Sequence, residues 1–386
     1  MNVAKLKKLQ YEEVAKCTRC GFCLPNCPTY TVKRTEAYTA RGRNAVTRAL
    51  IEGNLDLSPE LAKAVYSCLG CGACTVACFP SIKTAQAVTA DRECMVAARY
   101  HPRVLEKLLE SLNEYQNISG EDQEERGDWR ELIRGAPEDA FEKDRAEYVY
   151  FVGCVASFFP LAQGIPAKMA RIMDQAGLDL AILGGEEWCC GFPLLGAGMA
   201  EEMVRLREHN QAKVQALGAQ KAVFSCPSCF HTWSRFYETE AQLLHSSQLL
   251  ADLLESKRLD LNPVRMKVTY HDPCDLGRNS GVYEEPRQVL AAIPGLKLIE
   301  LPNNRSLTNC CGGGGNVEMV DPDLAAAVAA QKVEEILATG AEAVVSSCQQ
   351  CLRTILTSVR RQKLDLKVYD LTDVVMMSLQ GKEERK

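Results

Sequence analysis

The stretch CTRCGFCLPNCP, residues 17–28, places four cysteines within eleven residues and ends on a proline. The stretch CLGCGACTVACFP, residues 68–80, repeats the cysteine spacing. In a C-x2-C-x2-C-x3-C-P run, three thiolates hold one cubane iron–sulfur cluster and the fourth ligates a neighbouring cluster. The repeated run therefore predicts an N-terminal domain with two cubane clusters that exchange one ligand each.

The exchange assigns eight thiols to two 4Fe–4S clusters. Zinc is the alternative, but zinc prefers two C-x2-C pairs separated by a loop, whereas three closely spaced ligands suit one face of a cubane. The second run departs from the pattern because Phe79 separates its last cysteine from Pro80. One cluster takes Cys17, Cys20, Cys23 and Cys78, and the other takes Cys68, Cys71, Cys74 and Cys27.

The composition limits the explanations for so many thiols. The chain has 386 residues and 19 cysteines, and a chain of this length can bury two or three cores without disulfides. Its first residues, MNVAKLKKLQYEEVAK, contain no apolar stretch typical of an export signal. We therefore expect a protein of the reducing cytoplasm whose thiols bind metal.

Charge and hydropathy exclude two classes of function. No apolar run is long enough for a membrane-spanning helix, so we expect contact with the inner face of a membrane only through a partner. The net charge is -5 and the basic residues are dispersed, which argues against a nucleic-acid-binding protein.

The pattern of apolar residues predicts an α+β multidomain chain. Residues 1–100 read as a mostly helical, two-cluster ferredoxin-like domain, and 101–147 read as a helical and charged connector on the surface. Strand-like and helix-like stretches then alternate twice, over 148–262 and 263–386. This order predicts two duplicated α/β units with parallel sheets.

The cysteines of the C-terminal half support the duplication independently. Each copy contains one cysteine, then a Cys-Cys-Gly (CCG) motif about 35 residues later, then a C-x2-C pair, all at the ends of predicted strands. Open parallel sheets build their sites at that edge. Cys154 corresponds to Cys274, Cys189 and Cys190 correspond to Cys310 and Cys311, and Cys226 and Cys229 correspond to Cys348 and Cys351, with offsets of 120 to 122.

Adjacent cysteines do not easily bind one small ion, but five thiolates could hold an open, non-cubane cluster. The stretches EEWCCGFP, YHDPCDLGRNSGVYEEPR and NCCGGGGNVEM, with CTRCGFCLPNCPTY and a following RGR, resemble the CCG-domain iron–sulfur oxidoreductases. This family includes D-type heterodisulfide reductase subunits and iron–sulfur subunits of glycolate oxidase. The resemblance covers nearly the whole chain, and both closing C-x2-C pairs favour the heterodisulfide reductase type.

The resemblance implies two catalytic sites, each with a non-cubane 4Fe–4S cluster, and reduction of a disulfide between them. It leaves open whether both sites are loaded. The first site would consist of Cys154, Cys189, Cys190, Cys226 and Cys229, and the second of Cys274, Cys310, Cys311, Cys348 and Cys351.

A few residues remain outside these assignments. Cys94 reads as a small buried apolar residue, and His271 and His231 could donate protons or simply pack. The glycine-rich stretches match neither a P-loop nor GxGxxG, so we expect no flavin or nucleotide on this chain. A partner would then supply or accept electrons.

The leading hypothesis is an iron–sulfur oxidoreductase subunit in which electrons pass through the cubanes to the CCG sites and reduce a disulfide. The alternative is a non-catalytic electron relay for a flavoprotein that oxidises glycolate or lactate. The expected partner is a flavoprotein dehydrogenase or reductase subunit, or a membrane cytochrome b subunit. The substrate and the direction of electron flow do not follow from the sequence.

Overall fold

The computed structural model describes residues 9–135 and 140–379, which form two compact units. The first, which we call the helical unit, combines the described residues up to 109 with residues 193–203 and 303–334. The rest forms the sheet unit. Each unit is therefore discontinuous in sequence, while the predicted boundaries at 100, 147 and 262 follow chain order.

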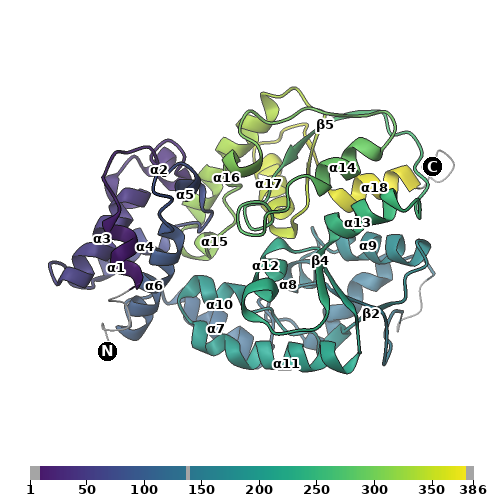
Figure 1. Ribbon diagram of the computed structural model, residues 1–386, viewed down its shortest axis with the longest axis horizontal. Coiled ribbons are helices and arrows are strands. Elements are labelled where there is room, and N and C mark those ends of the chain that lie inside the picture. The colour runs from purple at the N-terminus through teal and green to yellow at the C-terminus, as the bar shows by residue number, and fades with distance from the viewer. Residues whose placement is uncertain (1–8, 136–139, 380–386) are drawn as a thin grey trace. The chain divides into compact units, whose positions relative to one another are not determined.

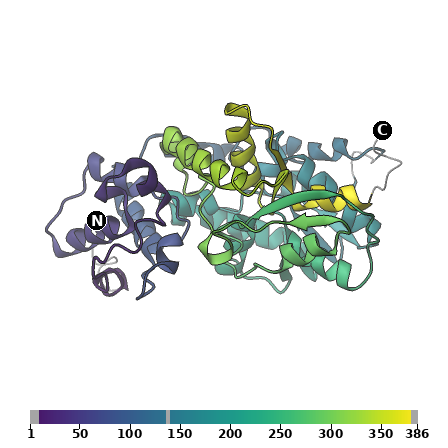
Figure 2. The same cartoon turned by 90° about the horizontal axis from the view of Figure 1, so that it is seen from above.

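The helical unit contains no strand among its described residues. Its N-terminal portion is the purple part of Figure 2, where helices and loops are drawn. Its helices have clear start signals: Ser58 accepts a hydrogen bond from the backbone N–H of Leu61, and Pro59 is the first helical residue of α4. The elements are α1 (Leu9–Ala15), α2 (Pro28–Lys33), η2 (Glu36–Tyr38), α3 (Ala40–Glu52), α4 (Pro59–Tyr66), α5 (Ala73–Val76), α6 (Thr84–Ala97), the start of α7 (Val104–Glu114), most of α10 (Phe192–Ala197), η5 (Ala200–Glu202), η6 (Arg305–Leu307), α15 (Val317–Val320) and most of α16 (Pro322–Leu337).

A buried carboxyl group makes the stability of this unit depend on pH. The Thr47 hydroxyl donates to Asp91 at 2.6 Å, but burial raises the pKa of Asp91 from 3.8 to about 7. The folded chain thus holds this proton more tightly than the unfolded chain, so the stabilisation is complete below the unfolded pKa and is lost as pH rises through the folded pKa.

We expect a loss of about 2 kcal/mol between about pH 5.5 and pH 7. Asp91→Asn should reduce this slope by the contribution of Asp91, because an amide does not ionise. Unfolding midpoints measured across this range test it, with exposed Asp56→Asn as the control. An unchanged slope in Asp91→Asn would contradict the assignment.

The sheet unit contains two four-stranded parallel sheets with the same strand order, β2-β1-β3-β4 and β6-β5-β7-β8. Strands β2 and β4 of the first sheet and β5 of the second are labelled in Figure 1. The predicted duplication and the parallel sheets are confirmed. The elements are the end of α7, η3 (Gln123–Leu132), β1 (Tyr148–Phe151), α8 (Cys154–Phe158), α9 (Gly164–Gln175), β2 (Leu180–Ile182), η4 (Gly184–Glu186), α11 (Met203–Ala216), β3 (Lys221–Phe224), α12 (Pro227–Phe236), β4 (Gln242–His245), α13 (Ser246–Glu255), β5 (Met266–His271), α14 (Glu285–Ala292), β6 (Leu296–Leu298), β7 (Ala343–Ser346), α17 (Gln349–Arg361), β8 (Lys367–Asp370) and α18 (Leu371–Leu379).

The two sheets share one hydrophobic core. It joins Tyr150 and Val223 of the first sheet with Tyr270 and Val345 of the second. Continuous apolar runs such as YVYF form fully buried strands, as expected for parallel sheets covered by helices. The shared core holds the two copies together within one unit.

The connector predicted over 101–147 is not only a surface segment. Its helix η3 buries Arg126 and Trp129, each 1% exposed, although the surrounding sequence is strongly charged. Trp129 belongs to the shared core. The prediction of a surface connector is wrong for this helix, because charge along a segment does not show which side packs inward.

Within the described ranges, no helix combines the length and the apolar character needed to cross a bilayer.

Candidate iron–sulfur sites

Four cysteines of the two N-terminal runs line one pocket in the helical unit. Cys68, Cys71 and Cys74 come from the second run, and Cys27 comes from the first. Burial, followed by the neighbouring sulfurs of the other three, raises the pKa of Cys74. A buried thiol surrounded by three other sulfurs suits a cationic iron–sulfur core, which binds thiolates. The structure thus brings together the four residues that the exchanged assignment groups.

Arg43, from the RGR stretch, is a buried residue that lines this pocket. Its side chain is buried and lies 3.9 Å from the Cys27 sulfur, and it donates to the hydroxyls of Thr29 and Ser67. The Cys27 sulfur also contacts the Thr29 hydroxyl at 3.2 Å. A buried positive charge thus lies beside a predicted cluster ligand.

The other N-terminal set is more open. Cys20 is exposed, and Cys17, Cys23 and Cys78 are partly buried. Burial raises the pKa of Cys23, and the nearby Cys27 and Cys17 sulfurs add to this effect. Cys78 follows α5 by two residues. The more exposed set is the one through which electrons could be exchanged with another protein.

All five cysteines of the first CCG set lie in the sheet unit and are buried. Cys154 begins α8 after β1, and Cys226 precedes α12 after β3, so both stand where parallel strands end. The five thiols influence one another's ionisation in the order Cys154, Cys189, Cys190, Cys229 and Cys226.

The ionisation of these thiols follows from that series. Hydrogen bonds from Cys189 and Cys229 lower the pKa of Cys190 to about 6. The bond with Cys189, together with burial, raises the pKa of Cys154 well above its ordinary value. Five soft sulfur ligands in one buried set favour several metal ions, which would bind them as thiolates.

The backbone leaves room beside these thiols. Gly153 has a φ of +81°, and a Cβ atom there would lie 3.1 Å from the Cys229 sulfur. A larger residue would be strained and would crowd the sulfur. Five buried thiols, free of disulfides, beside such a cradle fit a cluster with five thiolate ligands.

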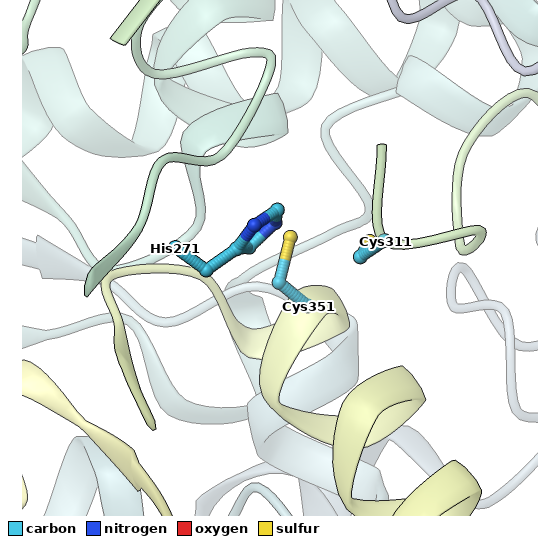
Figure 3. Close-up of side chains that lie close together, drawn as sticks. All are labelled: His271, Cys311 and Cys351. Atoms are coloured by element: carbon cyan, nitrogen blue, oxygen red, sulfur yellow. The ribbon is translucent and has the colours of Figure 1, made fainter. Parts of the chain in front are cut away.

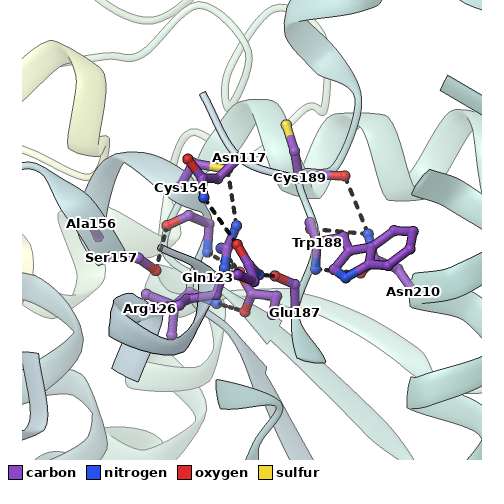
Figure 4. A network of polar contacts seen from close by, with 12 residues as sticks. Asn117, Gln123, Arg126, Cys154, Ala156, Ser157, Glu187, Trp188, Cys189 and Asn210 are labelled. Atoms are coloured by element: carbon purple, nitrogen blue, oxygen red, sulfur yellow. Dashed lines mark hydrogen bonds and ion pairs between the residues drawn. The ribbon is translucent and has the colours of Figure 1, made fainter. Parts of the chain in front are cut away.

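A polar network encloses the first set (Figure 4). The Arg126 guanidinium donates to the Cys154 sulfur at 3.3 Å and to the Glu187 carboxylate at 2.7 Å. That carboxylate also accepts from the backbone N–H groups of Val152 and Gly153. Sequence analysis gave neither residue a role: Arg126 lies 28 residues before Cys154, and Glu187 stands inside the quoted stretch EEWCCGFP, where nothing in the sequence showed what it contacts.

The same network holds the CCG motif. The Asn210 side chain accepts from the Trp188 backbone N–H and donates to the carbonyl groups of Trp188 and Cys189. The Tyr237 hydroxyl donates to the Cys190 carbonyl at 3.1 Å. The Trp188 ring stacks on His209. These contacts fix the backbone of the motif without using its thiols.

The second CCG set is divided between the two units. Cys274, Cys348 and Cys351 belong to the sheet unit, and the Cys310-Cys311 pair belongs to the helical unit. Within the sheet unit, a ring nitrogen of buried His271 lies within 4.8 Å of the Cys351 sulfur (Figure 3, which also draws Cys311). His271 thus lies beside a predicted ligand.

The two copies exchange contacts through their C-x2-C pairs, inside the sheet unit. Ser228, from the first pair, donates to Asp275 at 2.6 Å, next to Cys274 of the second copy. Gln349, from the second pair, donates to the Val152 carbonyl at 2.8 Å and accepts from the Ala156 N–H at 3.2 Å. Each pair therefore contacts the loop that carries the first cysteine of the other copy.

A buried arginine joins the cluster loop to both CCG segments within the helical unit. Arg92 donates to the Gly196 carbonyl at 2.6 Å, the Gly315 carbonyl at 3.2 Å and the Cys68 carbonyl at 2.6 Å. Gly196 and Gly315 follow the two CCG motifs by a few residues. A Cβ atom on Gly315, which has a φ of +63°, would overlap the Cys68 carbonyl oxygen. The contact thus requires glycine.

Two other predicted residues lie apart from these networks. His231 is partly buried, and burial lowers its pKa although Asp275 opposes the change. Cys94 lies in α6, is only partly buried, and has its pKa raised to about 11 by that burial. Cys94 is therefore a neutral thiol at physiological pH, and its role stays a prediction, as does that of His231.

Comparison with known families gives a match for most of the cysteine-bearing sequence. Residues 13–82 match the 4Fe-4S dicluster domain, and residues 148–233 and 268–356 each match the cysteine-rich CCG domain. The predicted 4Fe–4S clusters and the CCG resemblance are confirmed at the level of these domains. The individual ligands stay a prediction.

Relatives match nearly the whole chain. The D-type subunit of the dihydromethanophenazine:CoB–CoM heterodisulfide reductase of Methanosarcina barkeri is 32% identical over 98% of this chain and 97% of the relative. The EtfAB:quinone oxidoreductase of Syntrophomonas wolfei is 24% identical over 95% of this chain and 58% of its own length. A hypothetical protein of Helicobacter pylori shares the fold, with a TM-score of 0.58 at 10% identity over 99% of this chain and 77% of that protein.

Proposed function

The chain belongs to the family of CCG-domain iron–sulfur oxidoreductases that includes the D-type subunits of heterodisulfide reductase, and we propose that it is the disulfide-reducing subunit of such a complex. Membership of the family makes it an iron–sulfur oxidoreductase subunit. What we propose beyond family membership is that the substrate is a disulfide, and this rests on the contacts between the two CCG copies.

The observation that carries the proposal is the reciprocal exchange between the C-x2-C pairs. The Ser228–Asp275 and Gln349–Val152 hydrogen bonds keep the first site beside residues of the second copy. Reduction of one disulfide to two thiols consumes two electrons and two protons. When bound, each iron–sulfur cluster supplies electrons singly. Two CCG copies whose C-x2-C pairs contact each other within the sheet unit therefore suit a two-electron reaction better than one copy.

The residues that would hold the clusters follow from the sites described above. The pocket of Cys27, Cys68, Cys71 and Cys74 and the more open set of Cys17, Cys20, Cys23 and Cys78 would bind the two cubanes. The five buried thiols from Cys154 to Cys229 would bind the first non-cubane cluster, and Cys274, Cys310, Cys311, Cys348 and Cys351 the second.

A partner must deliver the electrons, and relatives of this chain are named as parts of multi-subunit reductases. We infer a flavoprotein subunit or a membrane cytochrome b subunit as the donor. Attachment to the inner face of the membrane would then depend on that donor. The exposed Cys20 and the more open cubane set favour entry of electrons there.

Metal analysis of anaerobically purified protein tests the proposal first. We expect about sixteen irons per chain, because four sites would each hold four irons. Reduced by a viologen dye, the loaded protein should turn over mixed alkyl disulfides. Colourless protein containing zinc would overturn the assignment of iron–sulfur clusters. Iron-loaded protein that reduces no disulfide would overturn the assignment of the substrate.

The relay function is the second candidate, and similarity to the EtfAB:quinone oxidoreductase of Syntrophomonas wolfei favours it. A relay would accept electrons from a reduced flavoprotein at full speed but reduce no disulfide. The same loaded protein, assayed with a flavoprotein donor and with a disulfide acceptor, separates the two functions.

A further inference from the structure

A single arginine outside the matched domains contacts a thiol of the first CCG set. Arg126 lies in η3, between the matched ranges 13–82 and 148–233, and is 1% exposed. Its guanidinium donates to the Cys154 sulfur at 3.3 Å (Figure 4). It is therefore a buried positive charge in direct contact with a predicted cluster ligand.

The arginine is held in place by more than that contact. Glu187, itself 1% exposed, receives a hydrogen bond from Arg126 at 2.7 Å and is fixed by the N–H groups of Val152 and Gly153 at 2.7 and 2.8 Å. The guanidinium also lies over the Phe158 ring, 5.2 Å from its centre. Such a clamp leaves the guanidinium little freedom to leave the sulfur.

One hydrogen-bond donor of the Arg126 guanidinium, its Nε–H, is not used within the part of the chain that the structure describes. Its Nε–H is buried and has no hydrogen-bond acceptor among the described residues of the chain. A buried donor without a partner is costly, and a sulfide or a further sulfur ligand would satisfy it. The unused donor therefore fits a site that is completed by an additional acceptor.

The connector also holds the other side of the site. The Cys189 backbone N–H donates to the Gln116 carbonyl at 2.8 Å, and Gln123 donates to the carbonyl groups of Gly185 and Glu187. Asn117 in turn donates to the Gln123 side chain at 3.0 Å. The segment from 116 to 126 thus contacts both Cys154 and the CCG motif.

We propose that Arg126 is a positioning residue that raises the reduction potential of the first CCG site. Positive charge and hydrogen bonds directed at ligand sulfur stabilise the more reduced, more negative state of an iron–sulfur centre. The inference rests on the proposed function, because it needs the five thiols to hold a cluster. Arg126 would thus tune the reduction potential of this site from a segment that lies outside the CCG domain.

Potentiometric EPR titration of the complete, iron-loaded chain tests this inference. The first CCG site is identified as the signal that Cys190→Ser abolishes. Arg126→Gln alone would leave the Glu187 carboxylate buried without its partner, so the decisive variant is Arg126→Gln with Glu187→Gln. We expect its equilibrium constant for one-electron reduction to fall at least tenfold, a shift of about 59 mV to lower potential.

Two further variants separate electrostatics from structure. Arg130→Gln removes another arginine of η3, one that pairs with Glu142 and not with a thiol, and should leave the potential unchanged. Arg126→Lys keeps the charge but loses the planar guanidinium, so we expect a fall of about threefold.

A loaded double variant with an unchanged potential would overturn the inference and leave the proposed function intact. If the double variant does not assemble its cluster, an unchanged potential in Arg126→Lys overturns it equally. Absence of any iron signal in the unaltered chain would instead overturn the proposed function.

Discussion

Replacing Arg92 by methionine is expected to lower the apparent unfolding midpoint of the chain by about 6–12 °C. Arg92 donates to the buried carbonyl groups of Cys68, Gly196 and Gly315, and methionine can donate to none of them. Each buried acceptor left without a donor costs about 1–3 kcal/mol, so a total of at least about 3 kcal/mol is expected. Thermal unfolding of anaerobically purified protein, followed by circular dichroism, measures the change.

A matched variant shows whether burial causes this effect. Arg48→Gln removes an arginine of the same unit whose side chain is 41% exposed and pairs with Glu52 one helical turn away. A surface pair of this kind contributes about 0.3–0.5 kcal/mol, so its midpoint should move by no more than about 2 °C. Equal losses in Arg92→Met and Arg48→Gln would show that the three carbonyl contacts do not stabilise the fold.

Replacing Cys190 by serine is expected to remove the first CCG cluster, a loss of about four irons per chain. Cys190 stands in the middle of the series of sulfurs, and hydrogen bonds from Cys189 and Cys229 lower its pKa to about 6. A serine hydroxyl ionises far less readily and binds iron weakly. Iron and sulfide analysis with EPR measures the loss, and disulfide reduction should fall by more than the roughly 10–100-fold that is typical when only an outer-shell partner of a metal ligand is removed.

The control is Cys94→Ser, since Cys94 lies outside all four predicted sites and is a neutral thiol. It should keep its full iron content and activity. Cys311→Ser, the corresponding change in the second copy, should lose a similar amount of iron if that site is also loaded. Unchanged disulfide reduction in Cys190→Ser would exclude the first CCG site from catalysis.

The grouping of the cysteines follows largely from the sequence. The spacing of the two N-terminal runs predicted that Cys27 joins Cys68, Cys71 and Cys74, and these four line one pocket. The offsets of 120 to 122 between the CCG copies predicted two sheets with one topology. Such features are readable because metal ligation and strand periodicity constrain residues that are close in the chain.

The fourth strand of each sheet was not predicted. β4 and β8 are only four residues long, stand at a sheet edge and bury just part of their side chains. Such short strands carry little periodic signal, because one exposed edge removes the need for a continuous apolar run. Their existence follows from pairing with β3 and β7, which the chain order alone does not reveal.

The sequence by itself determined which thiols occur, in what groups, and on which alternating strands and helices. Only the tertiary structure decided which charges face them: Arg126 at Cys154, Arg43 at Cys27, and Arg92 at the Cys68 carbonyl. The physical reason is that ligand spacing is a local, covalent property. A buried arginine instead finds its partners among residues that are distant in the chain, after the surrounding surface has been removed from water.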